Sequence, residues 1–181
     1  ASSNKCLEGV PGVGFVLVQK AIIENAKGNC HSLSLDLFDQ WQSMEKNAQW
    51  RFTPPTHVLA AFHQALKEHH AEGGVQGRYD RYMQNCKIIC KEMKEIGFKQ
   101  LLPDHLQAPI IITFMQPDDP NFKFDEFYSA LSNKGFLIYP GKLTIANTFR
   151  IGCIGYLTAN DMIEALKAIK ATIKELNIQL N

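Results

Sequence analysis

The sequence has 181 residues, of which 45% are hydrophobic and 20% are charged, and its formal net charge is +1. These proportions are typical of a globular protein with a sizeable core and exclude an intrinsically disordered chain. A net charge close to zero provides no basic surface for a polyanion, so we expect no nucleic-acid partner.

The cysteines and the apolar segments bear on the cellular compartment. The five cysteines are odd in number and scattered, which favours a reducing compartment over a disulfide framework. Cys86 and Cys90 are four residues apart in a strongly helical segment, and we expect them to pack as small hydrophobes. No apolar stretch approaches the roughly 20 residues of a membrane span, and no leader pattern opens the sequence. We therefore predict a cytoplasmic protein without a membrane partner.

The first part of the chain predicts short elements separated by turns. Residues 14–18 are an apolar run that follows a glycine-rich turn, and they are predicted to form a short buried strand. A short helix is expected over about residues 20–26, closed by Gly28 and Asn29. Residues 33–47 have partly helical spacing.

Two long helices are predicted in the middle of the chain. The sequence Thr53-Pro54-Pro55 indicates a helix start, with Thr53 as the N-cap and proline at the first helical position. Apolar residues at helical spacing extend this helix to the Gly73-Gly74 pair. Residues 75–96 carry the most regular helical stripe in the sequence, and Gly97 is expected to cap that helix.

The rest of the chain alternates between strands and helices. Strands are predicted at residues 110–115, 136–139 and 148–154, and a helix is predicted over about 124–135. Thr158 and Asp161 have the spacing of a capping box, which opens a final helix. This order predicts an α+β arrangement with helices packed on a small sheet.

Lys5 is the first candidate for chemistry. Small polar residues surround it, and a turn broken by glycine and proline follows. A loop lysine whose pKa is lowered by burial or by neighbouring cations can act as a nucleophilic amine that forms a Schiff base. A solvated surface lysine is the alternative, because most lysines are exposed.

Arg150 is the second candidate. If residues 148–154 form a strand, Phe149, Ile151 and Cys153 face one side, and Arg150 shares the other side with Gly152. A guanidinium group beside glycine suits bidentate binding of a carboxylate or phosphonate, because glycine leaves room for the ligand. An edge-strand arginine paired with a surface acid is the alternative.

Thr53 is the third candidate. A hydroxyl and free N–H groups at a helix N-terminus form an anion site that suits a cofactor phosphate, although a purely structural N-cap is the alternative.

Two patterns typical of functional sites are missing from the sequence. The histidines and cysteines lack the spacings of metal ligands. Gly9, Gly12 and Gly14 lead into a predicted strand rather than a helix, which argues against a phosphate loop. We predict no metal site.

Five segments of the sequence occur in the order found in a known family. They are residues 3–12, 32–41, 50–57, 139–142 and 149–152. Together they closely resemble the C-terminal half of the 2-aminoethylphosphonate–pyruvate aminotransferases, which are pyridoxal phosphate enzymes of fold type I in the class V aminotransferase family. The resemblance covers essentially the whole chain.

The resemblance implies roles for four residues. Lys5 matches the lysine that forms a Schiff base with pyridoxal 5'-phosphate and shuttles a proton, and Asn4 matches a neighbouring position that touches the cofactor phosphate. Thr53 matches a residue that reaches the cofactor phosphate of the other subunit in a homodimer. Arg150 matches the arginine that binds the acidic groups of the substrates. The implied reaction is transfer of the amino group of 2-aminoethylphosphonate to pyruvate, a step of phosphonate catabolism.

The resemblance also implies a domain organisation. Residues 1–52 are expected to be a remnant of the large cofactor-binding domain, residues 53–74 an interdomain helix, and residues 75–181 the C-terminal small α/β domain with a mostly antiparallel sheet. The sequence opens without methionine, which suggests a fragment of a longer protein or a proteolysed one. Because the N-terminal half of the family is absent, we expect the chain alone to bind the cofactor weakly and to lack transaminase activity.

Three alternatives stay open at this point. An alanine–glyoxylate or serine–pyruvate aminotransferase shares the general arrangement of these segments. The sequences Asp-Gln-Trp at residues 39–41 and Trp-Arg-Phe-Thr at residues 50–53 nevertheless favour the phosphonate enzymes. A cysteine desulfurase is disfavoured, because no cysteine lies in an evident mobile loop ahead of Arg150. The chain could instead be a non-catalytic dimerisation or binding module.

Overall fold

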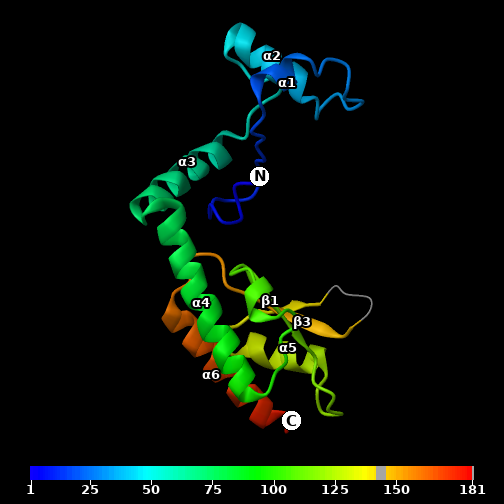
Figure 1. Cartoon of the computed structure of the whole chain (residues 1–181), viewed down its shortest axis with the longest axis vertical. Helices are drawn as coiled ribbons and strands as arrows, with labels where there is room; N and C mark the ends of the chain where they lie inside the picture. Colours follow the sequence, from blue (N-terminus) through cyan, green and yellow to red (C-terminus); the bar gives the residue numbers. More distant parts are fainter. Residues whose placement is uncertain (142–145, 181) are drawn as a thin grey trace. The chain divides into compact units, whose positions relative to one another are not determined.

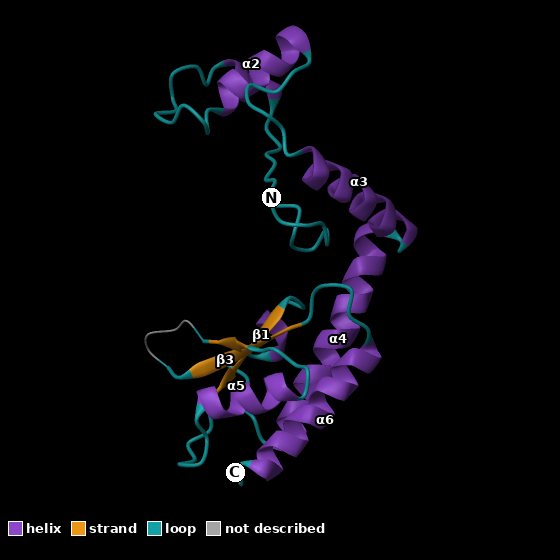
Figure 2. Ribbon diagram, turned by 180° about the vertical axis from the view of Figure 1, so that it is seen from behind, coloured by secondary structure: helices purple, strands orange, loops and turns teal. Residues whose placement is uncertain are grey.

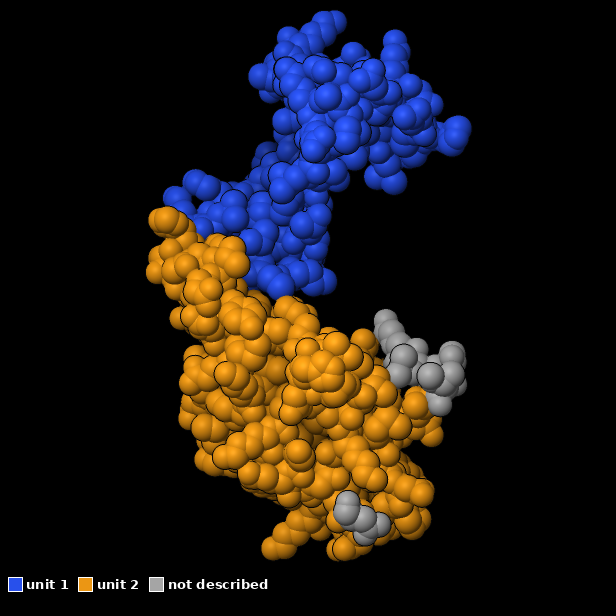
Figure 3. Space-filling view, viewed as in Figure 1, with its two compact units in different colours: residues 1–68 blue, residues 69–181 orange. Residues whose placement is uncertain are grey.

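The computed structural model describes residues 1–141 and 146–180. The chain divides into two compact units, residues 1–68 and residues 69–181 (Figure 3). The predicted domain boundaries after residues 52 and 74 differ from this division and stay a prediction. No helix among the described residues is both long and apolar enough to cross a membrane.

The first unit contains short helices joined by extended segments. Helix α1 covers Lys20–Glu24, helix α2 covers Leu37–Asn47, and helix α3 covers Thr56–Ala71 and contains the unit boundary. The carboxylate of Asp36 caps α2 by accepting hydrogen bonds from the backbone N–H groups of Phe38 and Asp39, at 2.9 and 3.2 Å. Helices α1 and α2 lie within the segments predicted to be helical, residues 20–26 and 33–47, and α3 ends close to the predicted Gly73-Gly74 pair.

The predicted buried strand at residues 14–18 is wrong. Residues 1–2 pair with this segment only as far as Phe15, through one bridge between Ser2 and Gly14 and hydrogen bonds between Ala1 and Phe15. Val16, Leu17 and Val18 are exposed. An apolar run forms a buried strand only where neighbouring strands complete its ladder, and the described residues supply none beyond Phe15.

The prediction that Thr53 is a helix N-cap is also wrong. Helix α3 begins at Thr56, and its first bond of the i to i+4 type runs from the N–H group of Leu59 to the carbonyl oxygen of Pro55, at 3.0 Å. Thr53 and Pro54 each precede a proline, and the residue before proline is pushed out of the helical region by steric clash with the ring. The helix therefore starts after the second proline.

The second unit opens with the long helix α4, Gly74–Ile96. Its predicted limits are confirmed, because Gly73 and Gly97 flank it in the left-handed conformation with φ angles of 103° and 112°. A short 3-10 helix, η1, covers Asp104–Leu106. Glycine at both ends allows the chain to turn sharply before and after α4.

A three-stranded antiparallel sheet follows. Strand β1 covers Ile111–Met115, β2 covers Tyr139–Pro140 and β3 covers Thr148–Gly152, in the spatial order β1-β3-β2. The strand predicted at 136–139 begins only at Tyr139, because the N–H group of Phe136 instead closes the preceding helix through the Leu131 carbonyl oxygen. Lys142 lies outside the described residues.

Two helices complete this unit, α5 at Phe124–Asn133 and α6 at Ala159–Glu175. The predicted capping box of α6 is confirmed, since the Thr158 hydroxyl accepts from the backbone of Asp161 and the Asp161 carboxylate accepts from the backbone of Thr158. Figures 1 and 2 show α4, α5 and α6 gathered beside the sheet. The predicted α/β fold with a small antiparallel sheet is therefore confirmed.

One face of the sheet packs into a closed aromatic core. Five phenylalanine rings meet there with centroid separations of 5.2 to 6.5 Å. Aromatic burial of this extent dominates the free energy of a small core. The five are Phe98, Phe114, Phe122, Phe127 and Phe149.

Candidate functional site

Arg150 lies at the centre of the sheet face that is turned away from the core. In strand β3, Phe149 and Ile151 are buried, while Arg150 and Gly152 are only partly buried. The predicted alternation is confirmed, and so is the burial of Cys153. However, β3 is the central strand of the sheet, so the alternative that Arg150 lies on an edge strand is wrong.

The guanidinium group of Arg150 has little competition from the protein. Its Nε–H group donates to the carbonyl oxygen of Pro140 at 3.1 Å, and within residues 1–141 and 146–180 no carboxylate forms an ion pair with it. A Cβ atom built on Gly152 would have no heavy atom within 4 Å. The arginine therefore retains donors for an anion, and the neighbouring glycine leaves open space beside it.

Two further side chains flank Arg150, and sequence reasoning missed both. Thr113 of β1 and Tyr139 of β2 are the residues directly paired with Arg150. Directly paired residues of antiparallel strands point to the same face, so a hydroxyl, a guanidinium and a phenol lie in a row. The register that creates this row depends on strand pairing, which the sequence alone does not specify.

Lys5 lies on a tight turn in the first unit. The Ser3 side chain is fully buried and its hydroxyl donates to the Val10 carbonyl oxygen at 2.7 Å. The N–H group of Glu8 donates to the Lys5 carbonyl oxygen at 2.9 Å. Lys5 itself is exposed and Asn4 is partly buried. The buried Ser3 therefore anchors the turn, and the two residues that follow it, Asn4 and Lys5, lie at the surface.

The turn packs closely on helix α3. Gly12 has a φ angle of 136°, and a Cβ atom there would approach a methyl group of Val58 to 2.9 Å. The rings of Phe15 and Phe62 stack with centroids 5.8 Å apart. Glycine is therefore needed at residue 12 both for its backbone conformation and for the close approach.

Thr53 lies in an open hollow of about 720 Å³ formed by residues 48–54. Thr53 is exposed, and its hydroxyl has no hydrogen-bond partner within the described residues. Arg51 in the same hollow lies 3.4 Å from the Asp39 carboxylate through Nη2, and its Nη1 is buried without a partner in the described chain. Arg51 was missed by sequence reasoning, and a spare buried donor of this kind suits an anion.

The four predicted residues are divided between the two units. Lys5, Asn4 and Thr53 lie in residues 1–68, whereas Arg150 lies in residues 69–181. The convergence of these four residues on one site stays a prediction. In the described part of the chain, no cluster of three histidine, cysteine or acidic side chains could hold a metal ion.

A charged network holds the segment that follows β3. The Glu72 carboxylate accepts from Nε of both Arg78 and Arg81, each at 2.6 Å, and Arg81 also donates to the Gly155 and Leu157 carbonyl oxygens. Hydrogen bonds from Arg81 and Arg78 lower the pKa of Glu72 to about 2, against the opposing effect of burial. The network ties the start of α4 to the segment that follows the strand carrying Arg150.

Comparison with known proteins gives close sequence relatives. No protein-family model matches the chain. The 2-aminoethylphosphonate–pyruvate transaminase of Pseudomonas aeruginosa is 52% identical over 178 residues, which cover 98% of this chain and 48% of that protein. The corresponding transaminase 1 of Polaromonas is 47% identical over 180 residues, 99% of this chain and 48% of that protein. The chain thus spans about half the length of these relatives.

Solved structures share the fold. Pyridoxamine–pyruvate aminotransferase from Mesorhizobium loti matches 97% of this chain and 46% of its own, with a TM-score of 0.84 and 20% identity. Ureidoglycine–glyoxylate aminotransferase from Bacillus subtilis matches 99% of this chain and 47% of its own, with a TM-score of 0.81 and 17% identity. The chain therefore belongs to the same aminotransferase family as the 2-aminoethylphosphonate–pyruvate transaminases, and it spans about half of their length.

Proposed function

We propose that this chain supplies about half of an aminotransferase that uses pyridoxal 5'-phosphate to transfer the amino group of 2-aminoethylphosphonate to pyruvate. The products are phosphonoacetaldehyde and L-alanine. The proposal rests on the relatives that carry this name and match nearly the whole chain.

Arg150 is the structural observation that carries the proposal. Its guanidinium group lies on an open sheet face beside a glycine, and no carboxylate of the described chain neutralises it. A phosphonate and a carboxylate both present paired oxygen atoms to a planar fork of N–H donors. One arginine therefore suits the amino donor and the amino acceptor in turn.

The side chains around Lys5 and Thr53 fit the chemistry of the cofactor. Pyridoxal phosphate, when bound, supplies the electron sink for the reaction. The exposed Lys5 presents an amine that suits an aldehyde and can accept and return the substrate proton at Nζ. The Thr53 hydroxyl, the Asn4 amide and the spare Nη1 of Arg51 offer donors for a phosphate.

We place the cofactor phosphate between two copies of the protein in this proposal. Thr53 and Arg51 would reach the cofactor of the partner subunit in a homodimer, while Lys5 and Asn4 would serve their own subunit. The cytoplasmic location is part of the same proposal, as are the two small-molecule substrates. The reducing compartment fits the absence of disulfides within the described chain.

The test joins this chain to the remaining half of the Pseudomonas aeruginosa relative. In that chimera, Arg150→Lys keeps the charge but loses the fork, and we expect kcat/KM to fall by about 10- to 150-fold for both substrates, the value of one charge-assisted hydrogen bond. Lys167→Gln, an exposed change on α6, is the matched control and should leave kcat/KM unchanged. Unchanged kcat/KM in Arg150→Lys would rule out the role of Arg150.

A second variant tests the space beside the arginine. Gly152→Val adds a side chain where no heavy atom lies within 4 Å, and valine suits a strand, so the protein should fold normally. We expect KM to rise for both 2-aminoethylphosphonate and pyruvate, with little change in thermal unfolding. Equal KM values in Gly152→Val and the parent would show that the substrates bind elsewhere.

The choice of amino donor separates this proposal from the related transaminases. With pyruvate as acceptor, the chimera should prefer 2-aminoethylphosphonate to serine, and the reverse preference would favour a serine–pyruvate enzyme. The isolated chain should show no turnover and no stable, stoichiometric visible absorbance of bound cofactor. A stable band with turnover from the isolated chain would refute that expectation.

A further inference from the structure

Three cysteines of the second unit form a thiol triad, which the proposed transamination does not use. Cys86 and Cys153 are buried, and Cys90 is half-buried. Cys86 and Cys90 lie one turn apart on α4, and Cys153 follows strand β3. The Sγ atoms of Cys86 and Cys90 are 3.8 Å apart. The amide of Asn85 donates to the Cys153 carbonyl oxygen at 3.4 Å, so the backbone at residue 153 lies against α4 beside Cys86.

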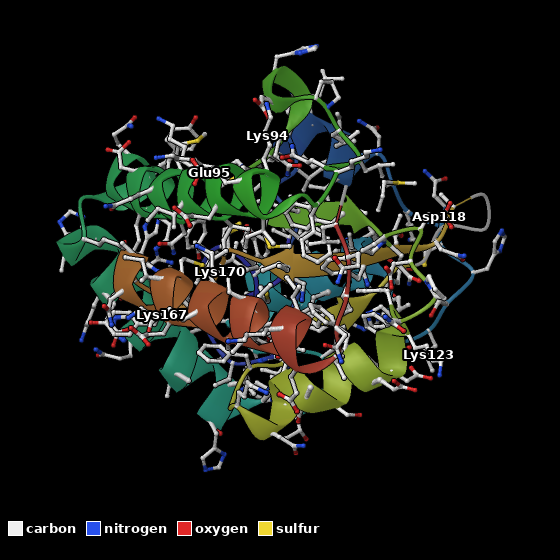
Figure 4. The ribbon with its side chains drawn as sticks, turned by 90° about the horizontal axis from the view of Figure 1, so that it is seen from below. Lys94, Glu95, Asp118, Lys123, Lys167 and Lys170 are labelled. Carbon is white, nitrogen blue, oxygen red and sulfur yellow. The ribbon has the colours of Figure 1, made fainter. Side chains whose placement is uncertain are left out.

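A cavity reaches the triad from the surface. Its volume is about 940 Å³, and both Cys86 and Cys90 line it. Four lysines line the same cavity, and one of them, Lys94, is labelled near the end of α4 in Figure 4. Asp104 is the acidic residue of this lining. The opening admits a small oxidant to Cys86 and Cys90.

The hydrogen bonds within the triad single out Cys86. Hydrogen bonding to Cys153 and to Cys90 lowers the pKa of Cys86, although burial opposes the shift. The same bond, together with burial, raises the pKa of Cys153, and the pKa of Cys90 rises for the same two reasons. Cys86 lines the cavity, and its lowered pKa favours the thiolate, which is the reactive form, so we assign it as the nucleophile of the triad.

Helix geometry decides which neighbour can bond to Cys86. A disulfide needs Cβ atoms about 3.5–4.5 Å apart, whereas residues four apart on a helix hold theirs about 5–6 Å apart. A bond between Cys86 and Cys90 would have to open a turn of α4. Cys153 is on another element and is free of that constraint.

We propose that the triad is a peroxide-reactive site in which Cys86 and Cys153 form a reversible disulfide. The Cys86 thiolate attacks hydrogen peroxide, breaks its O–O bond and, with one proton, yields a sulfenic acid and water. The Cys153 thiol then attacks that sulfur, forms the S–S bond and releases a second water. The site is independent of the transaminase proposal, and the bond would link α4 to the segment three residues beyond Arg150.

The experiment uses the whole 181-residue chain and tryptic mapping after treatment with hydrogen peroxide and blocking of the remaining thiols. Trypsin separates the three cysteines into different peptides, namely residues 82–87, 88–91 and 151–167. Before the thiols are blocked, we expect the intact protein to lose the mass of two hydrogen atoms. After blocking and digestion, we expect peptide 82–87 to be linked to peptide 151–167. Dithiothreitol should restore the original mass.

Variants keep the proposal falsifiable. Cys153→Ser should abolish the link and leave a sulfenic acid on Cys86 that dimedone traps, whereas Cys30→Ser, an exposed cysteine, should leave the link intact. Far-UV circular dichroism confirms that each variant is folded. A link between peptides 82–87 and 88–91, or oxidation of Cys6 and Cys30 with none at Cys86, would overturn the proposal.

Discussion

The two units of this chain, which Figure 3 colours separately, bury their apolar residues to very different extents. In residues 69–181, Phe127 and Phe149 are fully buried in one closed core. In residues 1–68, Leu17 is 91% exposed and Leu33 is 76% exposed. Extended apolar surface of this kind is typical of surfaces that pack against further polypeptide. Residues 69–181 thus contain a closed hydrophobic core, whereas residues 1–68 bury few large apolar side chains.

The difference bears on the candidate site. Arg150 is held by a sheet whose other face is fully packed, so its position follows from a stable core. Lys5 and Thr53 lie on loops of a unit whose buried hydrophobic residues are few, among them Ile23 and Phe38. A packed core of the same chain therefore fixes the strand that carries Arg150, whereas the loop that carries Lys5 rests on few buried side chains.

The largest expected effect comes from opening the closed core. Phe149→Ala removes a fully buried ring that meets four other phenylalanines, and it should lower the free energy of unfolding by about 3–5 kcal/mol. Urea denaturation measures this change. Leu17→Ala in the first unit is the control and should stay within about 0.5 kcal/mol. Equal costs for the two variants would contradict the contrast between the units.

The next effect comes from the network of Glu72. Glu72→Gln leaves Arg78 buried without its carboxylate, and we expect a loss of about 2 kcal/mol at pH 7. Because the folded pKa of Glu72 is depressed to about 2, its contribution is present above about pH 4.5 and is lost as the pH falls toward 2. The stability difference between parent and variant should therefore shrink over that range.

The control for this prediction is Glu164→Gln. Glu164 pairs with Lys167 on the exposed side of α6, and exposed pairs contribute little to stability. Urea denaturation at several pH values should give nearly the same curve as the parent. A pH-independent loss in Glu72→Gln would mean that packing, rather than the ion pairs, accounts for its effect.

A smaller effect is expected at the start of α6. Thr158→Ala removes the capping hydroxyl and should lower the free energy of unfolding by about 1 kcal/mol. Thr158→Ser keeps the hydroxyl and is the matched control. If alanine and serine give the same stability, the capping box contributes nothing to this helix.

The smallest effect on stability is expected in the first unit. Leu33→Ser replaces an exposed leucine and should change the free energy of unfolding by less than about 0.5 kcal/mol. The same variant should stay monodisperse at higher concentration in light scattering, because it reduces exposed apolar surface. Phe38→Ala in the same unit removes a buried ring and should cost clearly more. A large stability loss in Leu33→Ser would show that this surface is already buried.

Much of the second unit could be predicted from local patterns. Glycine at residues 73 and 97 marked the ends of α4, the capping box marked the start of α6, and alternation placed Arg150 opposite the core. These features depend on neighbours within a few residues, so the sequence displays them directly. The same local rules failed where a partner was needed, at residues 14–18 and 136–138.

The failure at Thr53 has a different cause. Two consecutive prolines offered two positions for the helix start, and the restriction on residues before proline selected the later one. Arg51, with its buried and unpartnered Nη1, gave no signal in the sequence, because burial of that atom depends on how residues 48–54 fold back on α2.

The sequence by itself determined the family, the helix limits set by glycine and the alternation that turns Arg150 away from the core. These follow from side-chain identity and short-range spacing. Only the tertiary structure decided that β3 is the central strand, that Thr113 and Tyr139 flank Arg150, and that the backbone of Cys153 lies against α4. Strand order and contacts between distant segments depend on which apolar faces pack together, a property of the whole core rather than of any local pattern.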